Sequence, residues 1–378
     1  MQYNSLQRVI ITDISHLFYK FAFGAGSTVL TATVMINGVP TVVDTKLPSM
    51  TIKAIHRWSN HGTNPTVVCF DSRGCARSRK AYFATKHGVE HGVGKGYKSS
   101  RDSQNDVFYQ GINLTQQLLQ QGGVMTLKAD GYEADDLVKI AVDKAKKQFP
   151  NLPIHVVTGD ADLVPLVDEQ VSVFLSSRKT TYAERKEWEL NHYVQITPRT
   201  YQKYMEDTTA FKSLNVPYNT IILAKCLRGD KSDEIEGFPK FTPTKYNKLL
   251  EDLKNDGVDI GNLFRYDDSV GTVCYRATDQ PVPKELINTT PTEQMIMRYT
   301  EPKKLTEMCQ VLSKYLSDDI IEHIRFVYKG INLNGAIVDV PDMFKRRPIH
   351  LTQDIPCYSE AQLQMAVSVY QINLPILT

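Results

Sequence analysis

The chain has 378 residues, of which 42% are hydrophobic and 23% charged, as in an ordinary soluble globular protein. This length allows a sizeable core, arranged either as two domains or as one elaborated domain. The 44 basic and 42 acidic residues leave a formal net charge of +2, so the overall charge neither indicates nor excludes a nucleic-acid partner.

The six cysteines are scattered along the chain, without a CxxC pair or a cluster of histidines. We therefore expect reduced thiols in the core and no zinc site. The first residues contain only a short apolar run, which ends at Asp13, and no later segment is long enough to span a bilayer. These features favour an intracellular protein without membrane contact.

The first predicted strand runs from Arg8 to Asp13, and its apolar residues are typical of a parallel strand that is buried on both faces. A helix over SHLFYKFAFG and another from Thr51 to Ser59 follow it. The next buried strand, from Thr66 to Asp71, again ends in an acid. A single aspartate at a strand end is more often a turn residue that bonds its own backbone. Only several such aspartates together indicate a functional site.

The composition changes between Arg73 and Arg101, where eight basic residues face a single acid, Glu90. Glycines at 88, 92, 94 and 96 and the aromatic residues Tyr82, Phe83 and Tyr97 are interleaved with them. One interpretation is a solvated, flexible loop. The other is a segment that grips phosphates, stacks its rings on bases and becomes ordered only on nucleic acid. The basic residues are Arg73, Arg77, Arg79, Lys80, Lys86, Lys95, Lys98 and Arg101.

An amphipathic helix is predicted from Phe108 to Gln121, and a strand around Val124 to Leu127 follows it. The motif YEADDL then opens a further helix, because apolar residues recur at helical spacing behind its acids. One or two carboxylates at a helix start usually serve as caps or complement the helix dipole. The acids at this start are Glu133, Asp135 and Asp136.

The apolar run from Ile154 to Val157 predicts a buried strand, and Asp160 and Asp162 lie just past its carboxyl end. In open α/β sheets the ligand site lies outside the carboxyl ends of the strands, so these acids should converge with Asp13, Asp71 and the acidic helix start. Like charges held this close raise one another's pKa and destabilise the fold unless cations neutralise them. Because oxygen-only ligands favour Mg²⁺ or Mn²⁺ over zinc, the sequence predicts a hard-metal site.

A strand from Val171 to Leu175 is expected next, followed by a polar hairpin or surface excursion. From Tyr218 the sequence predicts a helix, an acidic loop that carries Asp230 and Asp233, and a second helix. The segment from Thr292 to Tyr328 is expected to be largely helical.

The order of these motifs resembles that of the flap-endonuclease and 5′-3′ exonuclease family, and most of all the ribonuclease H and exonucleases of bacteriophages. The resemblance rests on ITDISHLFYKFAFG, VVCFD, YKSSR, YEADDL, TGDADLVPLV and LRGDKSDEIEG, and it covers about residues 9–250. It implies an α/β fold, in which helices flank a central, mostly parallel sheet of the PIN-like 5′ nuclease type. It also implies a nuclease domain at 1–215 with a basic arch at 73–101, a helical duplex-binding region of the helix-hairpin-helix type at 216–330, and a return strand and tail at 331–378.

The resemblance implies a phosphodiesterase that uses two Mg²⁺ or Mn²⁺ ions to activate water and to stabilise the departing 3′ oxygen. The residues that would hold one ion are Asp13, Asp71, Glu133 and Asp135. The residues that would frame the second are Asp136, Asp160, Asp162, Asp230 and Asp233.

A basic side chain of the arch should contact the scissile phosphate, and two alignments assign it differently. Spacing from Asp71 favours Arg79, Lys80 and Lys86, whereas the YKSSR string favours Lys98 and Arg101. The glycine-rich hairpin of the family is altered, since only Gly237 remains of its glycines. We therefore expect side chains rather than backbone groups to contact the duplex phosphates. These nucleic-acid contacts would be Arg77, Lys240, Lys245 and Lys248.

The leading interpretation is a structure-dependent 5′ nuclease that removes flaps or RNA primers during phage DNA replication in the host cytoplasm. Expected substrates are DNA with a 5′ end or flap, a nicked duplex, or an RNA–DNA hybrid. A single-strand-binding protein or a clamp is an open choice of partner, and such enzymes are usually monomers. The alternatives are a non-catalytic DNA-binding module with the same fold and a metal-dependent small-molecule phosphatase. The full set of carboxylates disfavours the first, and the basic segment disfavours the second.

Overall fold

The structure is a computed structural model that describes residues 7–23, 31–36, 39–72, 74–85, 97–98, 106–176, 193–200, 216–264, 266, 273–275, 297–299, 303–333, 335, 337, 340–346, 349 and 351–370. The chain divides into two compact units. The first unit comprises Met1–Cys75, Arg101–Asn215 and His350–Thr378, and the second comprises Ala76–Ser100 and Val216–Ile349. Among the helices in the described ranges, none has both the length and the apolar character needed to cross a membrane.

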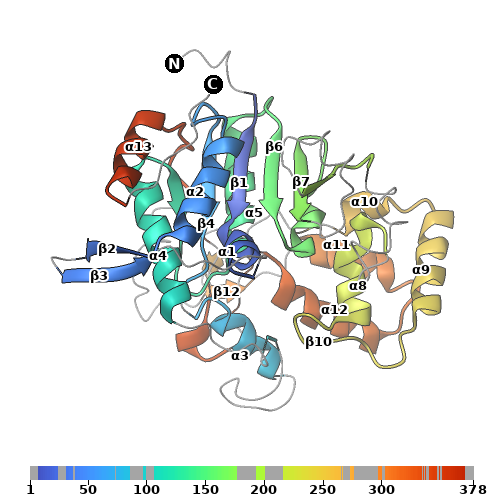
Figure 1. Cartoon of the computed structure of the whole chain (residues 1–378). Coiled ribbons are helices and arrows are strands. Elements are labelled where there is room, and N and C mark those ends of the chain that lie inside the picture. Colours follow the sequence, from blue (N-terminus) through green and yellow to red (C-terminus); the bar gives the residue numbers. More distant parts are fainter. Residues whose placement is uncertain are drawn as a thin grey trace. The chain divides into compact units, whose positions relative to one another are not determined.

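A six-stranded sheet in the order β5-β4-β1-β6-β7-β8 forms the centre of the first unit (Figure 1). Neighbouring strands pair in parallel, except that β8 is antiparallel to β7. The predicted α/β fold with a mostly parallel sheet is therefore confirmed. The strands are β1 (Val9–Asp13), β4 (Thr66–Cys69), β5 (Met125–Leu127), β6 (Ile154–Thr158), β7 (Val171–Ser176) and β8 (Tyr193–Ile196).

Apolar side chains cover both faces of the sheet, because successive residues of a strand point to opposite sides. Ile10, Val68 and Val157 belong to one hydrophobic cluster, to which α1, α2, α4 and α13 also contribute. Ile11 and Val67 alternate with these residues and are equally buried. Helix α5 contacts β1, β4 and β6. Burial on both faces explains the continuous apolar runs of these strands.

The first unit contains the four helices that were predicted, in the expected order and with shifted boundaries at α2, and two further helices, η2 and α13, that were not predicted. They are α1 (Ile14–Phe23), α2 (Lys46–Trp58), α4 (Asp106–Gln121), α5 (Ala134–Gln148), the 3₁₀ helix η2 (Ala161–Leu166) and α13 (Glu360–Ser368). Helix α2 starts five residues before the predicted Thr51 and contains Pro48 in its first turn. A proline is tolerated there because the first turn has no intrahelical partner for its missing N–H.

The hairpin of β2 (Thr31–Ile36) and β3 (Val39–Asp44) was not predicted. The strands are antiparallel, and Ile36 pairs with Val39. The dipeptide Asn37-Gly38 between them is a strong hairpin signal when β-branched residues flank it, as they do here. The predicted polar excursion after β7 lies outside the described residues.

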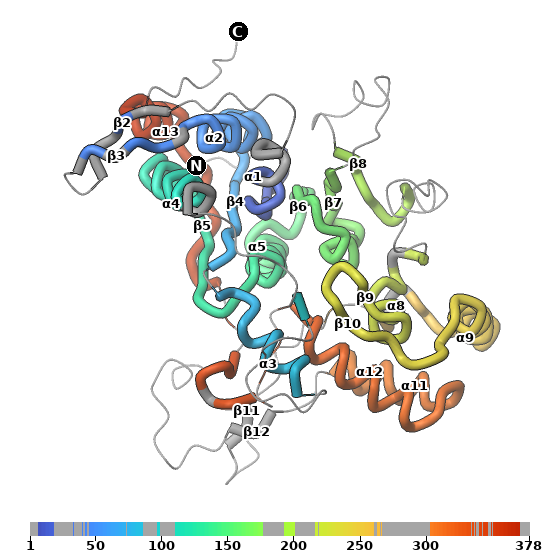
Figure 2. The backbone as a smooth tube through the Cα atoms, turned by 60° about the horizontal axis from the view of Figure 1, so that its bottom comes forward, coloured from blue at the N-terminus to red at the C-terminus, as the bar shows by residue number. Residues whose placement is uncertain are grey.

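The second unit is largely helical, as expected from Tyr218 onward, and α11 and α12 run side by side in it (Figure 2). Part of the segment predicted as helical is instead β12, which pairs with β11. The elements are α3 (Arg77–Thr85), η3 (Tyr218–Thr220), α8 (Ile221–Arg228), β9 (Gly229–Asp230), β10 (Ile235–Glu236), α9 (Pro243–Asn255), α10 (Ile260–Leu263), β11 (Val273–Tyr275), β12 (Met297–Tyr299), α11 (Lys303–Leu312), α12 (Asp318–Ile331) and η5 (Asp342–Phe344).

The aromatic residues of the basic segment lie in the core of the second unit. Tyr82 and Phe83 are 4% and 5% exposed, and Tyr97 is 4% exposed. Tyr82 stacks on Phe326 with ring centroids 4.8 Å apart, and Phe83 stacks on Tyr97 at 5.5 Å. A Cβ atom on Gly330 would lie 2.4 Å from the Phe83 ring, so α12 approaches α3 closely. The expectation that these rings stack on bases is therefore wrong, because side-chain packing against α12 already uses them.

Residues 351–370, the described part of the last segment, complete the core of the first unit. Tyr358, Leu363 and Val367 belong to the same hydrophobic cluster as Ile10. A Cβ atom on Gly122, after α4, would lie 2.4 Å from Leu363 Cδ1. Helix α13 therefore packs directly on the end of α4.

We expect Leu363→Ala to lower the free energy of unfolding by about 2–5 kcal/mol, because it leaves a cavity under a fully buried side chain. Met365 lies on the same helix and is 68% exposed, so Met365→Ala should change it by less than about 0.5 kcal/mol. Urea unfolding of the full chain measures both values. Equal effects of the two substitutions would contradict this packing.

Candidate metal centre

The strand order places the carboxyl end of β1 where the chain changes direction through the sheet. From β1 the chain proceeds to β4 and β5 on one side, and α5 then leads it to β6 on the other side. Such a switch point opens a crevice at the carboxyl ends of the strands, the usual ligand site of open α/β sheets. Asp13 ends β1, Asp71 lies two residues past β4, and Asp160 lies two residues past β6.

Three hydrogen bonds tie the ends of β1, β4 and α5 together. The backbone N–H of Ser15 donates to Asp13 Oδ1 at 2.8 Å, and the Ser15 hydroxyl donates to Asp71 Oδ2 at 2.6 Å. The other oxygen of Asp71, Oδ1, accepts the backbone N–H of Ala134 at 2.8 Å. Ser15 and Ala134 thus fix the positions of two carboxylates from different strands.

The acidic start of α5 has a capping role as well. Glu133 is the N-cap residue, and its side chain accepts the backbone N–H of Asp136. Asp136 Oδ2 in turn accepts the Glu133 N–H at 3.2 Å, which completes a capping box. Asp136 is fully buried, whereas Asp135 on the same turn is half-buried. The geometry gives Asp136 a helix-capping role, and its predicted role at a metal stays a prediction.

Asp160 and Asp162 lie at the start of η2. The backbone N–H of Asp160 donates to Thr158 Oγ1 at 3.0 Å. Asp160 is the N-cap of η2, and its Oδ1 accepts the N–H of Asp162 at 2.9 Å. Both carboxylates are half-buried.

Crowding of these acids has a clear electrostatic effect. Burial and the charge of Asp71 raise the pKa of Asp13 to about 8, with a further contribution from Asp160, although hydrogen bonds from Ser15 act against the shift. Burial, followed by the charges of Asp13, Asp135 and Asp71, also raises the pKa of the Cys69 thiol. The fold therefore brings Asp71 and Asp160 within electrostatic reach of Asp13, and Asp13, Asp71 and Asp135 within reach of Cys69. The carboxylate oxygens of these acids are the donor set that suits Mg²⁺ or Mn²⁺.

Three residues of this region were not predicted as part of the site. Ser15 and His16 belong to the ITDISH motif, whereas Tyr193 comes from β8, far along the chain. The imidazole of His16 hydrogen-bonds through Nδ1 to the Asp13 carbonyl and through Nε2 to the Tyr193 hydroxyl, at 2.8 Å. Burial and the charge of Asp13 raise the pKa of Tyr193, so its hydroxyl stays neutral. No local spacing reveals a contact across 177 residues.

The remaining predicted acids belong to the second unit, where lysines neutralise them. Lys225 Nζ lies 2.6 Å from Asp230 Oδ2. Burial alone would raise the pKa of Asp230, but Lys225 and hydrogen bonds from Ser232 bring it to about 2. Lys98 Nζ lies 3.8 Å from Asp233 Oδ1, and the Lys98 N–H donates to the Asp233 carbonyl at 3.0 Å.

The predicted phosphate contacts differ in exposure. Arg79 is 3% exposed and its Nε donates to the Gly330 carbonyl at 3.0 Å, so it joins the aromatic cluster of the second unit. Lys98 is also buried, and its ammonium lies 4.9 Å from the centroid of the Tyr97 ring. Lys80 is half-buried. Lys86 and Arg101 lie outside the described residues. The exposed predicted contacts are Arg77, Lys240, Lys245 and Lys248.

Residues 8–193 match the family described as "5'-3' exonuclease, N-terminal resolvase-like domain". The match contains five of the six strands of the sheet and all first-unit carboxylates named above. This part of the chain belongs to the 5′-3′ exonuclease family. The expected resemblance is thereby confirmed.

Curated relatives include DNA polymerases I of two bacteria. The chain is 25% identical over 231 residues to the thermostable DNA polymerase I of Thermus filiformis, which covers 61% of this chain and 22% of the polymerase. It is 30% identical over 145 residues to DNA polymerase I of Mycobacterium bovis, which covers 38% and 14%. The chain thus spans less than a quarter of the length of these relatives.

Solved structures that match the chain include the T5 5′-exonuclease and the catalytic core of Rad2. The T5 5′-exonuclease with bound divalent metal ions (zinc) is 13% identical, with 97% of this chain and 99% of that chain covered and a TM-score of 0.46. The catalytic core of Rad2 in complex with DNA substrate is 15% identical, with 98% and 88% covered and a TM-score of 0.41. Because both scores are below 0.5, the fold assignment rests on the sheet topology and the family match.

The raised pKa of Asp13 predicts a pH-dependent stability of the metal-free protein. The ordinary value is 3.8 and the folded value is about 8, so the folded state binds this proton more tightly. Stability should therefore fall as the pH rises from about 4 to about 8. We expect Asp13→Asn to raise the melting temperature in EDTA near pH 9, with a much smaller change near pH 5, where wild-type Asp13 is protonated.

The same substitution should remove the stabilisation that millimolar Mg²⁺ gives the wild type, because a ligand of the ion is lost. Asp354→Asn is the matched control, since Asp354 is 79% exposed in the same unit and pairs only with Lys144 at 2.7 Å among the described ion pairs. An Asp13→Asn protein that melts like the wild type at both pH values would refute the raised pKa of Asp13.

Proposed function

We propose that the protein is a divalent-metal-dependent 5′ nuclease that hydrolyses phosphodiester bonds, with the carboxylates at the end of β1 as its metal centre. The observation that carries this proposal is the crowding of Asp13, Asp71 and Asp160 at the switch point of a 5′-3′ exonuclease domain. A carboxyl whose pKa is near 8 destabilises the fold once ionised, and a cation offsets that cost. The site thus fits a protein that works with bound metal.

The ligands of two Mg²⁺ or Mn²⁺ ions would come from the first-unit carboxylates. Asp136 caps α5, and Asp230 and Asp233 pair with lysines of their own unit. We assign the first ligands among Asp13, Asp71, Glu133, Asp135, Asp160 and Asp162, whereas a metal-binding role of Asp136, Asp230 and Asp233 stays a prediction. When bound, such ions stabilise the negative charge that develops on a phosphodiester during hydrolysis.

The chain itself supplies the geometry of this centre. Ser15 holds Asp13 and Asp71 in fixed orientations through its two hydrogen bonds. His16 anchors the backbone of Asp13, and Tyr193 fixes the imidazole of His16. Carboxylates that are already positioned bind a metal without the entropy loss of ordering each side chain.

The second unit would bind the duplex part of the substrate. Helix α9 starts with Thr242 as N-cap, whose side chain accepts the Lys245 N–H, and with Pro243 in its first turn. Pro243 has no N–H and the Lys245 N–H is already bonded, so few backbone donors are left at this start. Lys240 and Lys245 flank it with exposed side chains, which would contact the phosphates instead.

The substrates we propose are DNA with a 5′ end or flap and the RNA strand of an RNA–DNA hybrid, as in the removal of primers and flaps during phage DNA replication. The order of the sequence motifs supports this choice. The test compares the rates at which the protein cleaves 5′-labelled flap, nicked and hybrid duplexes in Mg²⁺, with EDTA as the metal-free control. These rates rank the three substrates. A protein that cleaves none of them but hydrolyses small phosphate esters would refute the nuclease.

We expect Asp160→Asn to reduce cleavage of a 5′ flap at least about 100-fold, while affinity for the same DNA stays equal or rises. The substitution removes a metal ligand, so the charge that develops on the phosphate during cleavage is stabilised less. It also removes a negative charge that repels the DNA phosphates, so binding is not weakened. Rates under single-turnover conditions and binding in Ca²⁺ separate the two effects. Asp354→Asn is the control. Wild-type rates from Asp160→Asn would contradict the proposed metal centre.

Replacement of Lys240 and Lys245 by Ala should weaken binding to duplexes of any sequence by similar factors and make the salt dependence shallower. Contacts to phosphates carry no sequence information and release counterions. Lys254→Ala is the matched control, because Lys254 is exposed at the opposite end of α9. A loss of affinity confined to one sequence, or an equal loss from the control, would argue against this surface.

A further inference from the structure

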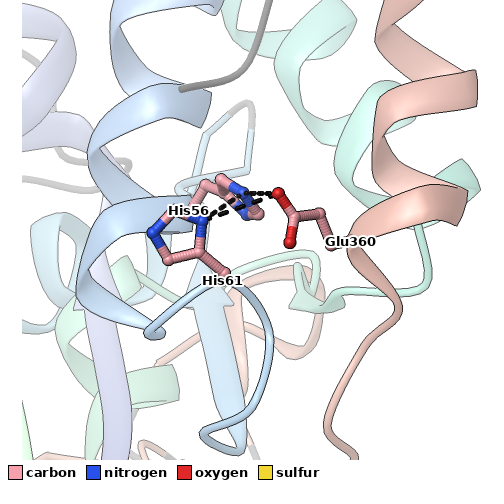
Figure 3. Close-up of side chains that lie close together, drawn as sticks. All are labelled: His56, His61 and Glu360. Carbon is pink, nitrogen blue, oxygen red and sulfur yellow. Dashed lines mark hydrogen bonds and ion pairs between the residues drawn. The ribbon is translucent and has the colours of Figure 1, made fainter. Parts of the chain in front are cut away.

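A second group of metal-ligating side chains lies in the first unit, apart from the carboxylates of β1. Figure 3 shows His56, His61 and Glu360 with their polar atoms turned toward one another. His56 comes from the last turn of α2, His61 from the loop after it, and Glu360 from the first residue of α13. Sequence spacing did not indicate this group, because 299 residues separate His61 from Glu360.

The backbone after α2 turns His61 back toward His56. His61 has a φ of 57°, a left-handed conformation that histidine adopts more readily than bulkier residues, and its N–H donates to the His56 carbonyl at 2.9 Å. The next residue, Gly62, has a φ of 87°, and a Cβ there would lie 2.4 Å from the Tyr358 carbonyl oxygen. Tyr358 N–H also donates to the Gly62 carbonyl at 3.3 Å, so the segment before α13 lies directly on this loop.

The hydrogen bonds around His56 determine which of its nitrogens carries the proton. The Ser59 hydroxyl donates to the His56 carbonyl at 2.8 Å, so it can only accept from the Tyr358 hydroxyl. Tyr358 then has only lone pairs to offer His56 Nδ1, which lies 3.1 Å away and must be the N–H donor. The lone pair of the neutral ring is therefore on Nε2, which faces His61 and Glu360.

The lone pair of His56 faces a carboxylate oxygen, and a cation between these two electron-rich atoms would remove their repulsion. His56 Nε2 lies 3.4 Å from Glu360 Oε1 and 3.1 Å from His61 Nδ1, and His61 Nδ1 lies 3.6 Å from Glu360 Oε1. One shared N–H of His61 could serve both neighbours, but a separation of 3.6 Å is too long for a hydrogen bond. A cation in contact with all three atoms satisfies them equally.

The three distances also indicate the kind of cation. Tetrahedral zinc, with bonds of about 2.0–2.1 Å, spaces its ligand atoms about 3.3–3.4 Å apart. An octahedral face with similar bonds would space them about 3.0 Å apart, shorter than all three distances. Two imidazoles and one carboxylate are ligands that zinc accepts, whereas Mg²⁺ prefers oxygen alone. The first unit thus contains two donor sets with different preferences.

We propose that His56, His61 and Glu360 form a zinc site that fastens residues 351–370 to α2, with solvent as the fourth ligand. Tyr358 is the positioning residue, because its hydroxyl fixes the tautomer of His56, as the outer hydrogen-bond partners of metal-bound histidines do. The site has an open side, since Glu360 is 42% exposed and His61 11% exposed. Bound zinc stabilises the docked segment because the unfolded chain does not present these three ligands together.

The test is titration of the chelator-treated full chain with ZnCl₂ by calorimetry, in an Asp13→Asn, Asp160→Asn background that weakens zinc binding to the other carboxylates. We expect one zinc per chain, and an affinity at least about 100-fold lower after His61→Asn or Glu360→Gln. Asparagine tolerates the left-handed conformation of residue 61, and Glu360 is partly exposed, so both variants should fold. Asp354→Asn, an exposed acid of the same segment, should leave the affinity unchanged.

Co²⁺ provides an independent signal, because tetrahedral Co²⁺ absorbs visible light far more strongly than octahedral Co²⁺. We expect intense bands without a thiolate charge-transfer band, lost in His61→Asn and unaffected by excess Mg²⁺. Zinc should also raise the melting temperature of the background protein but not of the two variants. Absence of zinc binding, or binding that neither substitution weakens, would show that the three side chains form a hydrogen-bonded cluster only.

Discussion

The burial of several carboxylates at one sheet edge is the physical constraint on which the first unit depends. Asp13 is 6% exposed at the end of β1, and Asp71 and Asp160 both raise its pKa. The protein tolerates this crowding because strands with apolar residues on both faces supply a large buried area, at about 25 cal/mol per Å². Hydrogen bonds from Ser15 and from the start of α5 stabilise the charged carboxylates and offset part of their repulsion. The buried apolar area of the strands thus offsets the repulsion between the carboxylates.

The core of the fold follows from local sequence patterns. Short apolar runs that end in an acid identified β1, β4 and β6 and placed Asp13, Asp71 and Asp160 at one edge of the sheet. The residues that were missed act through contacts between distant parts of the chain. Tyr193 reaches His16 across 177 residues, and Glu360 reaches His56 across 304. A periodicity of two or 3.6 residues carries no information about such pairs.

Composition was a poor guide to burial in the basic segment. Its lysines, arginines and glycines suggested a solvated arch with rings free to stack. In α3, however, Arg79, Tyr82 and Phe83 all enter the core of the second unit. The Nε of Arg79 has a hydrogen-bond acceptor there, the carbonyl of Gly330. Gly330 itself lies against the Phe83 ring of the same aromatic cluster. A charged side chain can be buried when its donors are paired, and sequence alone does not show the acceptor.

The first unit is discontinuous, and this has a consequence for synthesis on the ribosome. Leu363 and Val367 fill its core, yet they are translated only after the whole stretch Val216–Ile349 of the second unit. At about 5–20 residues per second, that interval lasts on the order of ten seconds. During this time the end of α4 at Gly122 has no helix to cover it, and the apolar surface beneath α13 faces water. The nascent chain therefore passes through a stage in which the fold of the first unit is incomplete and chaperones have an exposed apolar surface to bind.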